Sequence, residues 1–266
     1  MQDYVVTDGK GFRLADHDPG ADSGVPDKEA GRAEVAELTA RLDELQERFY
    51  ADGRHKVLVV LQGMDTSGKG GAIRKAFEGL HPTNVNVASF KAPTEIELAH
   101  DFLWRVHPHV PRRGHLSIFD RSHYEDVLIV RVHDLVPRSR WEARYDHIRN
   151  FEQMLVDEGT TIRKFFLHIS KKEQADRLQA RIDNPAKHWK FREEDLAERE
   201  RWDEYQAAYD EAIRRTATPD APWIVVPADR KWHRDLVICR TVVETLESLD
   251  LRYPRAKDDL SGLRVD

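Results

Sequence analysis

Cysteine is almost absent from this 266-residue chain, because Cys239 stands alone and no internal disulfide can form. Its neighbours at 236–243 are mostly apolar, which favours a packed side chain over a reactive thiol. No apolar run approaches the ~20 residues that a membrane helix needs. Residues 1–20 have neither the basic start nor the apolar stretch of a signal peptide. We therefore expect a cytoplasmic protein without a membrane segment.

An excess of positive charge is also lacking. The chain has 42 Lys and Arg against 48 Asp and Glu, which gives a net charge of −6. Proteins that coat nucleic acid are normally basic, so we expect no nucleic-acid partner. Any bound polyanion must be held by a local cluster of cations. The thirteen histidines show no H-E-x-x-H or Cys/His ligand pattern, so the sequence predicts no zinc site.

The organisation along the chain suggests one domain with two short extensions. Residues 1–30 are rich in Asp, Gly and Pro without a sustained period, which predicts an extended or disordered arm. The domain is expected at 31–253, and 254–266 form a tail. The domain opens with an amphipathic helix whose apolar face carries Leu38, Leu42, Leu45 and Phe49. This face predicts packing on the core, with a dimer seam as the alternative.

Strand and helix patterns alternate through the rest of the domain. Buried or alternating apolar runs predict strands at 57–61, 85–90, 116–119, 162–169 and 224–226. Helices are predicted at about 138–158, 170–182, 194–215 and 233–249. Thr94 with Glu97, and Ser170 with Glu173, have the spacing of capping boxes. The alternation predicts a three-layer α/β/α fold around a parallel sheet.

A glycine-rich stretch directly after the first strand has the form G-x-x-x-x-G-K and opens a helix, the context required of a phosphate loop. Glycines let successive backbone N–H groups converge on phosphate oxygens, and the helix N-terminus adds a favourable dipole. Lys69 supplies a mobile charge that can bridge two phosphates. The other expected contacts are Gly63, Met64, Thr66, Ser67, Gly68 and Gly70. An ordinary strand-to-helix turn is the alternative.

The loop lacks one usual part. Gly70 occupies the position where most such loops place a Ser or Thr that ligates magnesium. Asp65 and Asp120 are the candidates to replace that oxygen, because parallel strands direct their carboxyl ends to one crevice. Two carboxylates together with phosphate oxygens suit Mg²⁺. The alternative is that Asp120, after the strand at 116–119, only caps the turn before Ser122.

Three spaced motifs together resemble the family-2 polyphosphate kinases over about residues 50–253. They are G-x-D-x-x-G-K-G-G from Gly63, D-R-S from Asp120 and R-x-x-N-P-x-K-x-W-K from Arg181. The resemblance implies a P-loop kinase fold related to thymidylate kinase, with a helical lid at about 181–200. It also implies reversible, Mg²⁺-dependent phosphoryl transfer from inorganic polyphosphate to AMP or ADP.

The resemblance assigns roles to four residues in the first two motifs. Asp65 and Asp120 would position the metal and the accepting phosphate. Lys69 would cradle the phosphates, and Arg121 would contact the transferring group. Phosphoryl transfer requires in-line geometry and charge neutralisation more than covalent help, so this charge set fits the implied reaction.

Further residues are expected at the lid and at the acceptor. Arg181, Lys187 and Lys190 would reach the phosphates from the lid, with Trp189 as its hydrophobic anchor. Glu125 resembles the subgroup that accepts both AMP and ADP, since members restricted to diphosphates tend to carry an amide there.

Two other functions share the phosphate loop. An ATP-dependent nucleoside or nucleotide kinase of the thymidylate-kinase type would use a different donor. A P-loop binding protein would lack turnover, but it would not need the complete charge set. Adenine nucleotides are the expected substrates, with guanine left open, and the chain is expected to form a dimer or tetramer.

Overall fold

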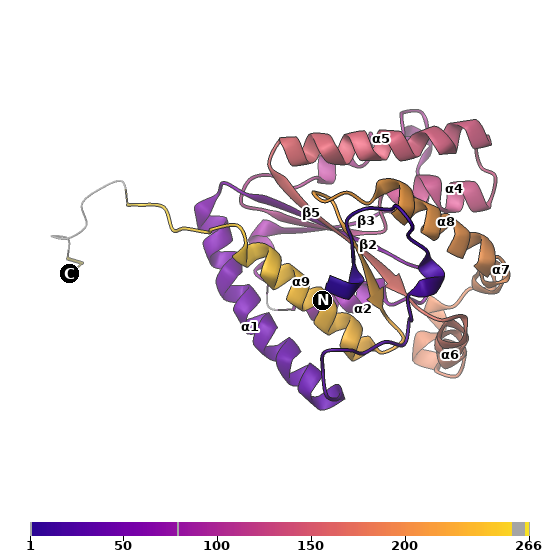
Figure 1. Ribbon diagram of the computed structural model, residues 1–266, viewed down its shortest axis with the longest axis horizontal. Coiled ribbons are helices and arrows are strands. Elements are labelled where there is room, and N and C mark those ends of the chain that lie inside the picture. Colours follow the sequence, from indigo (N-terminus) through magenta and orange to yellow (C-terminus); the bar gives the residue numbers. More distant parts are fainter. Residues whose placement is uncertain (1, 79, 257–263, 266) are drawn as a thin grey trace.

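The computed structural model describes residues 2–78, 80–256 and 264–265 (Figure 1). Within these residues six strands form one sheet in the order β1-β6-β5-β2-β4-β3. The strands are β1 (Val5–Val6), β2 (Lys56–Gln62), β3 (Val85–Ser89), β4 (Leu116–Asp120), β5 (Thr160–His168) and β6 (Trp223–Pro227). Strands β2 to β6 are mutually parallel, and β1 pairs with β6 in the antiparallel sense.

Helices cover both faces of this sheet, which confirms the predicted three-layer fold (Figure 1). They are α1 (Lys28–Asp52), α2 (Lys69–Ala76), α3 (Glu95–Leu98), α4 (Ile129–Val132), α5 (Arg138–Asp157), α6 (Lys171–Ile182), α7 (Glu194–Glu200), α8 (Trp202–Thr216) and α9 (Lys231–Glu247). Helices α1, α2 and α9 lie on one face, and α4, α5 and α8 on the other. None of the helices described here is long and apolar enough to cross a bilayer.

Strand β2 forms the centre of the sheet and leads into the phosphate loop. It pairs with β4 on one side and β5 on the other, and residues 57–61 are at most 1% exposed. A strand buried on both faces needs this continuous apolar run. Because the pairing sets Leu61 opposite Asp120, the ends of β2 and β4 meet at one edge.

The apolar face of α1 packs against the core of its own chain. Leu42, Leu45 and Phe49 are at most 2% exposed and belong to the core, and α1 packs along α9. The expectation of core packing is therefore confirmed for this stripe, and the alternative of a dimer seam is wrong. The helix begins at Lys28, earlier than the expected domain start at residue 31, because the Asp27 carboxylate accepts from two first-turn N–H groups.

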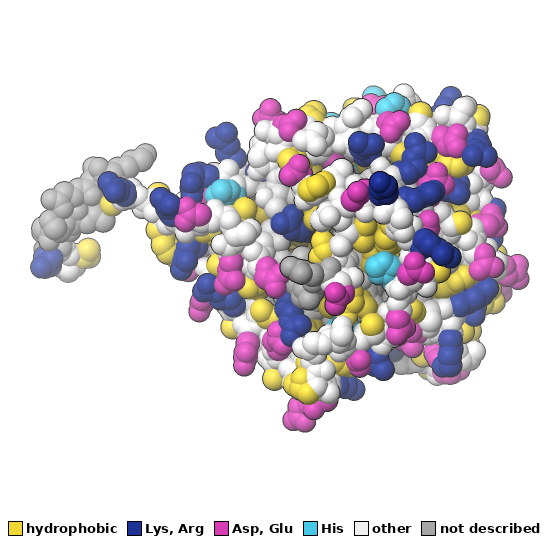
Figure 2. Space-filling model, viewed as in Figure 1, with side chains coloured by type: hydrophobic (Ala, Val, Ile, Leu, Met, Phe, Trp, Pro, Cys, Tyr) yellow, Lys and Arg dark blue, Asp and Glu magenta, His cyan; other side chains and the backbone are white. Residues whose placement is uncertain are grey.

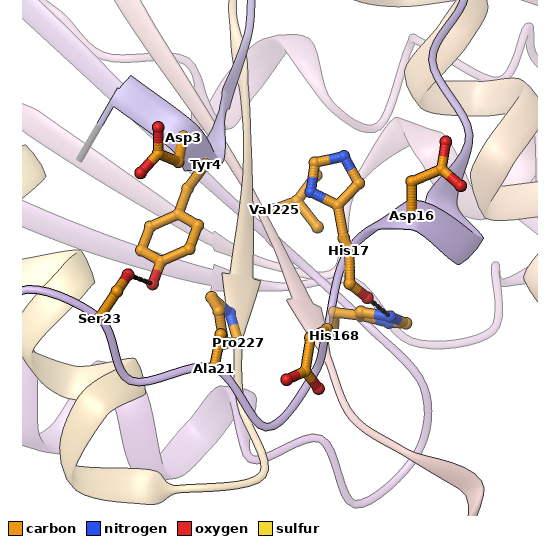
Figure 3. Close-up of a pocket in the computed structure, with 10 residues that line it drawn as sticks. Asp3, Tyr4, Asp16, His17, Ala21, Ser23, His168, Val225 and Pro227 are labelled. Carbon is orange, nitrogen blue, oxygen red and sulfur yellow. Dashed lines mark hydrogen bonds between the residues drawn. The ribbon is translucent and has the colours of Figure 1, made fainter.

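The N-terminal segment before α1 is extended and lies along its own sheet. Strand β1 pairs with β6, and the buried side chains Tyr4, Val6, Phe12 and Leu14 add to the core. Beneath the segment is a cavity of about 230 Å³ that Tyr4, His17 and His168 help to line (Figure 3). The Tyr4 hydroxyl lies 2.9 Å from Ser23 Oγ, and His168 Nε2 lies 3.1 Å from the His17 carbonyl oxygen.

One predicted helix is divided in two. The pattern at 194–215 forms α7 and α8, which meet at Arg201, whose φ of −87° and ψ of 19° interrupt the helix. The capping box at Thr94 is confirmed, with Glu97 N donating to Thr94 Oγ1 at 3.3 Å and Thr94 N donating to Glu97 Oε2 at 2.6 Å.

On the face shown in Figure 2, basic and acidic side chains are interspersed around apolar ones. This mixture agrees with the small net charge of −6. A polyanion would find no broad positive field on this face, so its binding must depend on cations gathered locally.

Candidate active site

The phosphate loop at 63–68 connects β2 to α2, as the sequence predicts. Thr66 and Gly68 have left-handed backbone angles, with φ of 65° and 99°. A Cβ on Gly68 would lie 2.1 Å from Arg234 Nη1, so a larger residue fits neither the angle nor the space. The loop therefore requires glycine at this position.

The loop presents polar groups without protein partners. The hydroxyls of Thr66 and Ser67 are buried and have no hydrogen-bond partner among the residues described. Buried hydroxyls are normally paired, so these two are suited to a ligand that accepts hydrogen bonds, such as phosphate. They stand next to the N-terminus of α2, which favours an anion.

Lys69 folds back over the loop, and its Nζ donates to the Gly63 carbonyl oxygen at 2.7 Å. Burial lowers the pKa of Lys69, and the Arg121 guanidinium lowers it further. Three carboxylates oppose this shift, those of Asp65, Asp120 and Glu125. One lysine, one arginine and three acids thus interact electrostatically at the carboxyl end of the sheet.

Asp120 ends β4, and the following residues turn sharply. Arg121 has a left-handed φ of 63°, and its Nη2 donates to Asp65 Oδ1 at 3.0 Å. Ser122 caps the next turn, η5 (His123–Val127), by accepting from Tyr124 N. The capping role is therefore filled by Ser122. Among the described residues no group of three His, Cys, Asp or Glu forms a ready cation cage.

Glu125 lies on η5 next to this cluster. Burial raises the pKa of the Glu125 carboxyl, while Arg121 and Lys69 lower it. The Gln62 amide lies between Glu125 and Ser122. In the orientation that satisfies both of its ends, it donates to Glu125 Oε1 at 3.0 Å and accepts from Ser122 Oγ at 3.0 Å.

The lid residues lie on the end of α6, on η6 (Pro185–Lys190) and on α7. Arg181 donates to the Lys190 carbonyl oxygen at 3.0 Å and lies 3.6 Å from Asp195. Lys187 and Lys190 are exposed, and within the described part neither side chain is hydrogen-bonded to the phosphate loop. The structure thus brings the first two motifs together and leaves the lid lysines apart.

Trp189 does not anchor the lid, and that expectation is wrong. Its side chain is 78% exposed, with Lys190 Nζ 4.8 Å from its ring centroid. Polar contacts hold the η6 turn instead, with Lys187 N donating to the Asn184 carbonyl oxygen at 2.7 Å and His188 Nε2 lying 2.8 Å from the Ile182 carbonyl oxygen.

Comparison with known proteins identifies the family of this chain. A family model for polyphosphate kinase 2 matches residues 25–254. The chain belongs to the polyphosphate kinase 2 family. The AMP/ADP-polyphosphate phosphotransferase of Meiothermus ruber is 56% identical over 256 residues, which cover 96% of each protein. The ADP-polyphosphate phosphotransferase of Rhodopseudomonas palustris is 48% identical over 226 residues, covering 80% of this chain and 78% of that protein.

A solved structure extends the agreement to the fold. The crystal structure of polyphosphate kinase 2 from Arthrobacter aurescens TC1 superposes with a TM-score of 0.94 at 45% identity, and covers 97% of this chain and 92% of that one. The predicted family and P-loop kinase fold are therefore confirmed.

Sequence reasoning missed the residues that support the phosphate loop of this polyphosphate kinase from behind. Arg177 Nη1 donates to the carbonyl oxygens of Thr66 and Ser67, both at 2.9 Å. Its Nη2 donates to the carbonyl oxygens of Ala228 and Asp229 at 2.6 and 3.1 Å. Arg234 donates to the Gly68 carbonyl oxygen at 3.2 Å.

No motif marks these two arginines. The available signal is positional, since Gln174, Arg177 and Leu178 share one buried face of α6. Gln174 also belongs to this support, because its amide donates to the Asp65 carbonyl oxygen at 3.2 Å. Arg177 therefore occupies a position on the buried face of α6 where an apolar residue is expected, and this is the signal that points to its role.

Proposed function

We propose that the protein transfers a phosphoryl group from inorganic polyphosphate to AMP or ADP, and in reverse, at the phosphate loop. Family membership makes it a polyphosphate kinase. The observation that carries the assignment of the site is the cluster of Lys69, Arg121, Asp65 and Asp120 at one sheet edge. The relative from Meiothermus ruber, named for both acceptors, supports AMP and ADP as substrates.

The chemistry that these residues supply is charge neutralisation. The terminal phosphate of an acceptor nucleotide is ionised near neutral pH, because its second pKa is ~6, so no strong general base is required. The main obstacle is repulsion between two polyanions. Lys69 and Arg121, with the loop N–H groups, would hold donor and acceptor phosphates in line and balance their charge.

Mg²⁺ is the proposed cofactor, held by Asp65 and Asp120 together with substrate phosphates. The donor set fits, because Mg²⁺ is commonly bound by one or two carboxylates and completes its shell with phosphate and water oxygens. The space beside Gly70 also fits this arrangement. A Cβ at Gly70 would meet no atom within 4 Å, so phosphate or water oxygens could occupy the place of the missing side-chain hydroxyl. When bound, the ion would offset the negative charge of the phosphates.

Glu125 is proposed to help the site accept AMP as well as ADP. Its carboxyl is tied to Gln62 and lies within the electrostatic reach of Lys69 and Arg121, where an acceptor phosphate would approach. Replacing Glu125 with Asn should lower AMP phosphorylation relative to ADP phosphorylation. An unchanged ratio of the two rates would remove this role from Glu125.

The lid and the assembly complete the proposal. Arg181, Lys187 and Lys190 are proposed to cover the polyphosphate chain, and the exposure of the two lysines leaves them available. A dimer or tetramer and a cytoplasmic location remain predictions, which light scattering and cell fractionation would test.

The test of the function is a donor comparison. The protein is incubated with ADP, Mg²⁺ and long-chain polyphosphate, and ATP formation is followed with and without each component. We expect ATP only when polyphosphate is present, with loss of activity on chelation of Mg²⁺. Phosphorylation of a nucleoside or monophosphate by ATP, without any use of polyphosphate, would favour the thymidylate-kinase type instead.

A further inference from the structure

A buried polar network lies directly beneath η5, the turn that carries Glu125. Its ionic members are Lys164 of β5, whose side chain is fully buried, and Glu152 of α5, whose side chain is 3% exposed. Lys164 Nζ and Glu152 Oε2 are 2.6 Å apart. The charge neutralisation proposed for phosphoryl transfer uses neither residue.

Every donor of Lys164 is used. Besides Glu152, its Nζ donates to the Thr216 carbonyl oxygen at 2.8 Å and to the Tyr124 hydroxyl oxygen at 3.0 Å. The ammonium group thereby joins β5, α5, the end of α8 and η5. An ammonium has three N–H donors, so this set leaves none unsatisfied.

The Glu152 carboxylate holds two consecutive residues of η5. Its Oε1 accepts from the Tyr124 hydroxyl at 2.8 Å and lies 3.2 Å from His123 Nε2. The next residue along the turn is Glu125. Because two neighbouring side chains end on one fixed carboxylate, the backbone of η5 has little freedom to rotate or shift.

The network is not needed merely to fill space. Lys164 belongs to a strand whose neighbours Phe165, Phe166 and Leu167 are fully buried apolar residues. Taking a charge pair out of water is costly, and well-packed apolar residues of similar volume often stabilise a fold equally well. What an ion pair supplies and an apolar pair does not is a directional set of hydrogen bonds.

We propose that the Lys164–Glu152 pair is a positioning element for phosphoryl transfer, which fixes η5 through Tyr124 and His123 and so places Glu125 against the acceptor phosphate. This inference rests on the proposed function. Reacting groups tolerate little displacement, and a misplacement of about 1 Å can lower a rate about 10²-fold. Gln62 and Ser122 restrain the start of the same turn, so loosening its base should tilt the turn and leave it attached.

The experiment removes the charges while keeping the volume. In the double variant Lys164→Met with Glu152→Gln, the glutamine still offers an oxygen to Tyr124 and His123. We expect a folded protein whose kcat with AMP falls about tenfold or more, because without the Lys164 ammonium group that oxygen is no longer held in one place and η5 is less firmly fixed. The KM for polyphosphate should stay within about twofold, because the substitutions leave the phosphate loop and the lid, which are proposed to hold the donor, unchanged.

A milder variant protects the test against misfolding. Tyr124→Phe removes one hydroxyl and keeps the ring, and should lower kcat with AMP about threefold to tenfold without changing the KM for polyphosphate. The matched control is Val242→Ala, a core position 1% exposed in α9, which lies on the sheet face opposite α5 and α8. It should lower the melting temperature and leave both kinetic constants at the parent values.

The outcomes separate the two claims. If folded variants of the network keep the parent kcat with AMP and ADP, the positioning role is overturned. It is also overturned if Val242→Ala loses as much kcat at the same melting temperature. The parent protein is assayed in parallel, and only its failure to make any product from polyphosphate would overturn the proposed function itself.

Discussion

The phosphate loop and the lid carry the same kind of charge, yet the fold holds them in different ways. Lys69 is buried, and the loop around it is supported from behind by the guanidinium groups of Arg177 and Arg234. Lys187 and Lys190 are exposed on a turn stabilised by its own backbone. Preorganised charge contributes most to a transition state, so substitutions in the loop should cost far more than those in the lid.

The largest loss is expected for Lys69→Met. Removing one preorganised charge from the site should lower turnover about 10²–10³-fold, as the loss of an oxyanion-hole donor does in other enzymes. The melting temperature should not fall, because the substitution also removes a desolvated charge. Lys28→Met, at the start of α1, is the matched control and should retain the parent rate. A loss of less than about tenfold would contradict the conclusion that charge in the loop matters more than charge in the lid.

Arg177→Met tests the support behind the loop. Four carbonyl oxygens would lose their donor, so we expect a stability loss of about 2–4 kcal/mol and turnover about tenfold lower. Denaturant unfolding and steady-state rates measure the two effects. Arg138→Met, on an exposed part of α5, should change neither. Parent-like stability would show that the loop needs no such support.

Removing both lid lysines, with Lys187→Ala and Lys190→Ala, should have a smaller effect of another kind. We expect the KM for polyphosphate to rise about threefold to tenfold with little change in kcat, because exposed charges contribute modestly to binding. The effect should shrink at high salt. Lys172→Ala is the control. A large fall in kcat at saturating polyphosphate would show that the two lid lysines act on the transition state, as Lys69 is expected to do.

His168 lies beneath the N-terminal segment, outside both regions, and should affect stability without affecting turnover at neutral pH. Burial lowers its pKa from 6.5 to about 4. Below pH 6.5 the unfolded chain therefore binds a proton that the folded one does not. The contribution of the neutral His168 side chain to the free energy of unfolding is complete above pH 6.5 and is lost as the pH falls to about 4. The loss is about 3 kcal/mol at most.

Unfolding of His168→Gln by denaturant at pH 7.5, 5.5 and 4.5 measures this contribution. The variant should lose less stability on acidification than the parent protein does. Burial also lowers the pKa of His17 and His233, so the difference between the two proteins isolates His168. Identical slopes would show that folding leaves the pKa of His168 unchanged.

The sequence predicted what local rules determine. A buried strand, a glycine-rich turn and a helix start follow each other within residues 57–69, so their arrangement needed no distant contact. That Asp65 and Asp120 both act on Lys69 at one edge of the sheet agrees with the rule that parallel strands end at one edge.

Distant contacts determine what was missed. The exposure of Trp189 and the break at Arg201 depend on how α6, α7 and α8 pack. Arg177 and Arg234 belong to no motif, because their partners are carbonyl oxygens, which every sequence possesses. The two-residue β1 is too short for any periodicity to indicate it.

The central claim, that carboxylates at the sheet edge and the cations beside them bring two phosphate chains together, is tested most directly with Asp120→Asn. Its rate of ATP formation from ADP and polyphosphate is measured over a range of Mg²⁺ concentrations. We predict turnover about 10²-fold lower, a higher Mg²⁺ requirement and an unchanged melting temperature. A folded Asp120→Asn protein that works at the parent rate with the parent Mg²⁺ requirement would contradict the account.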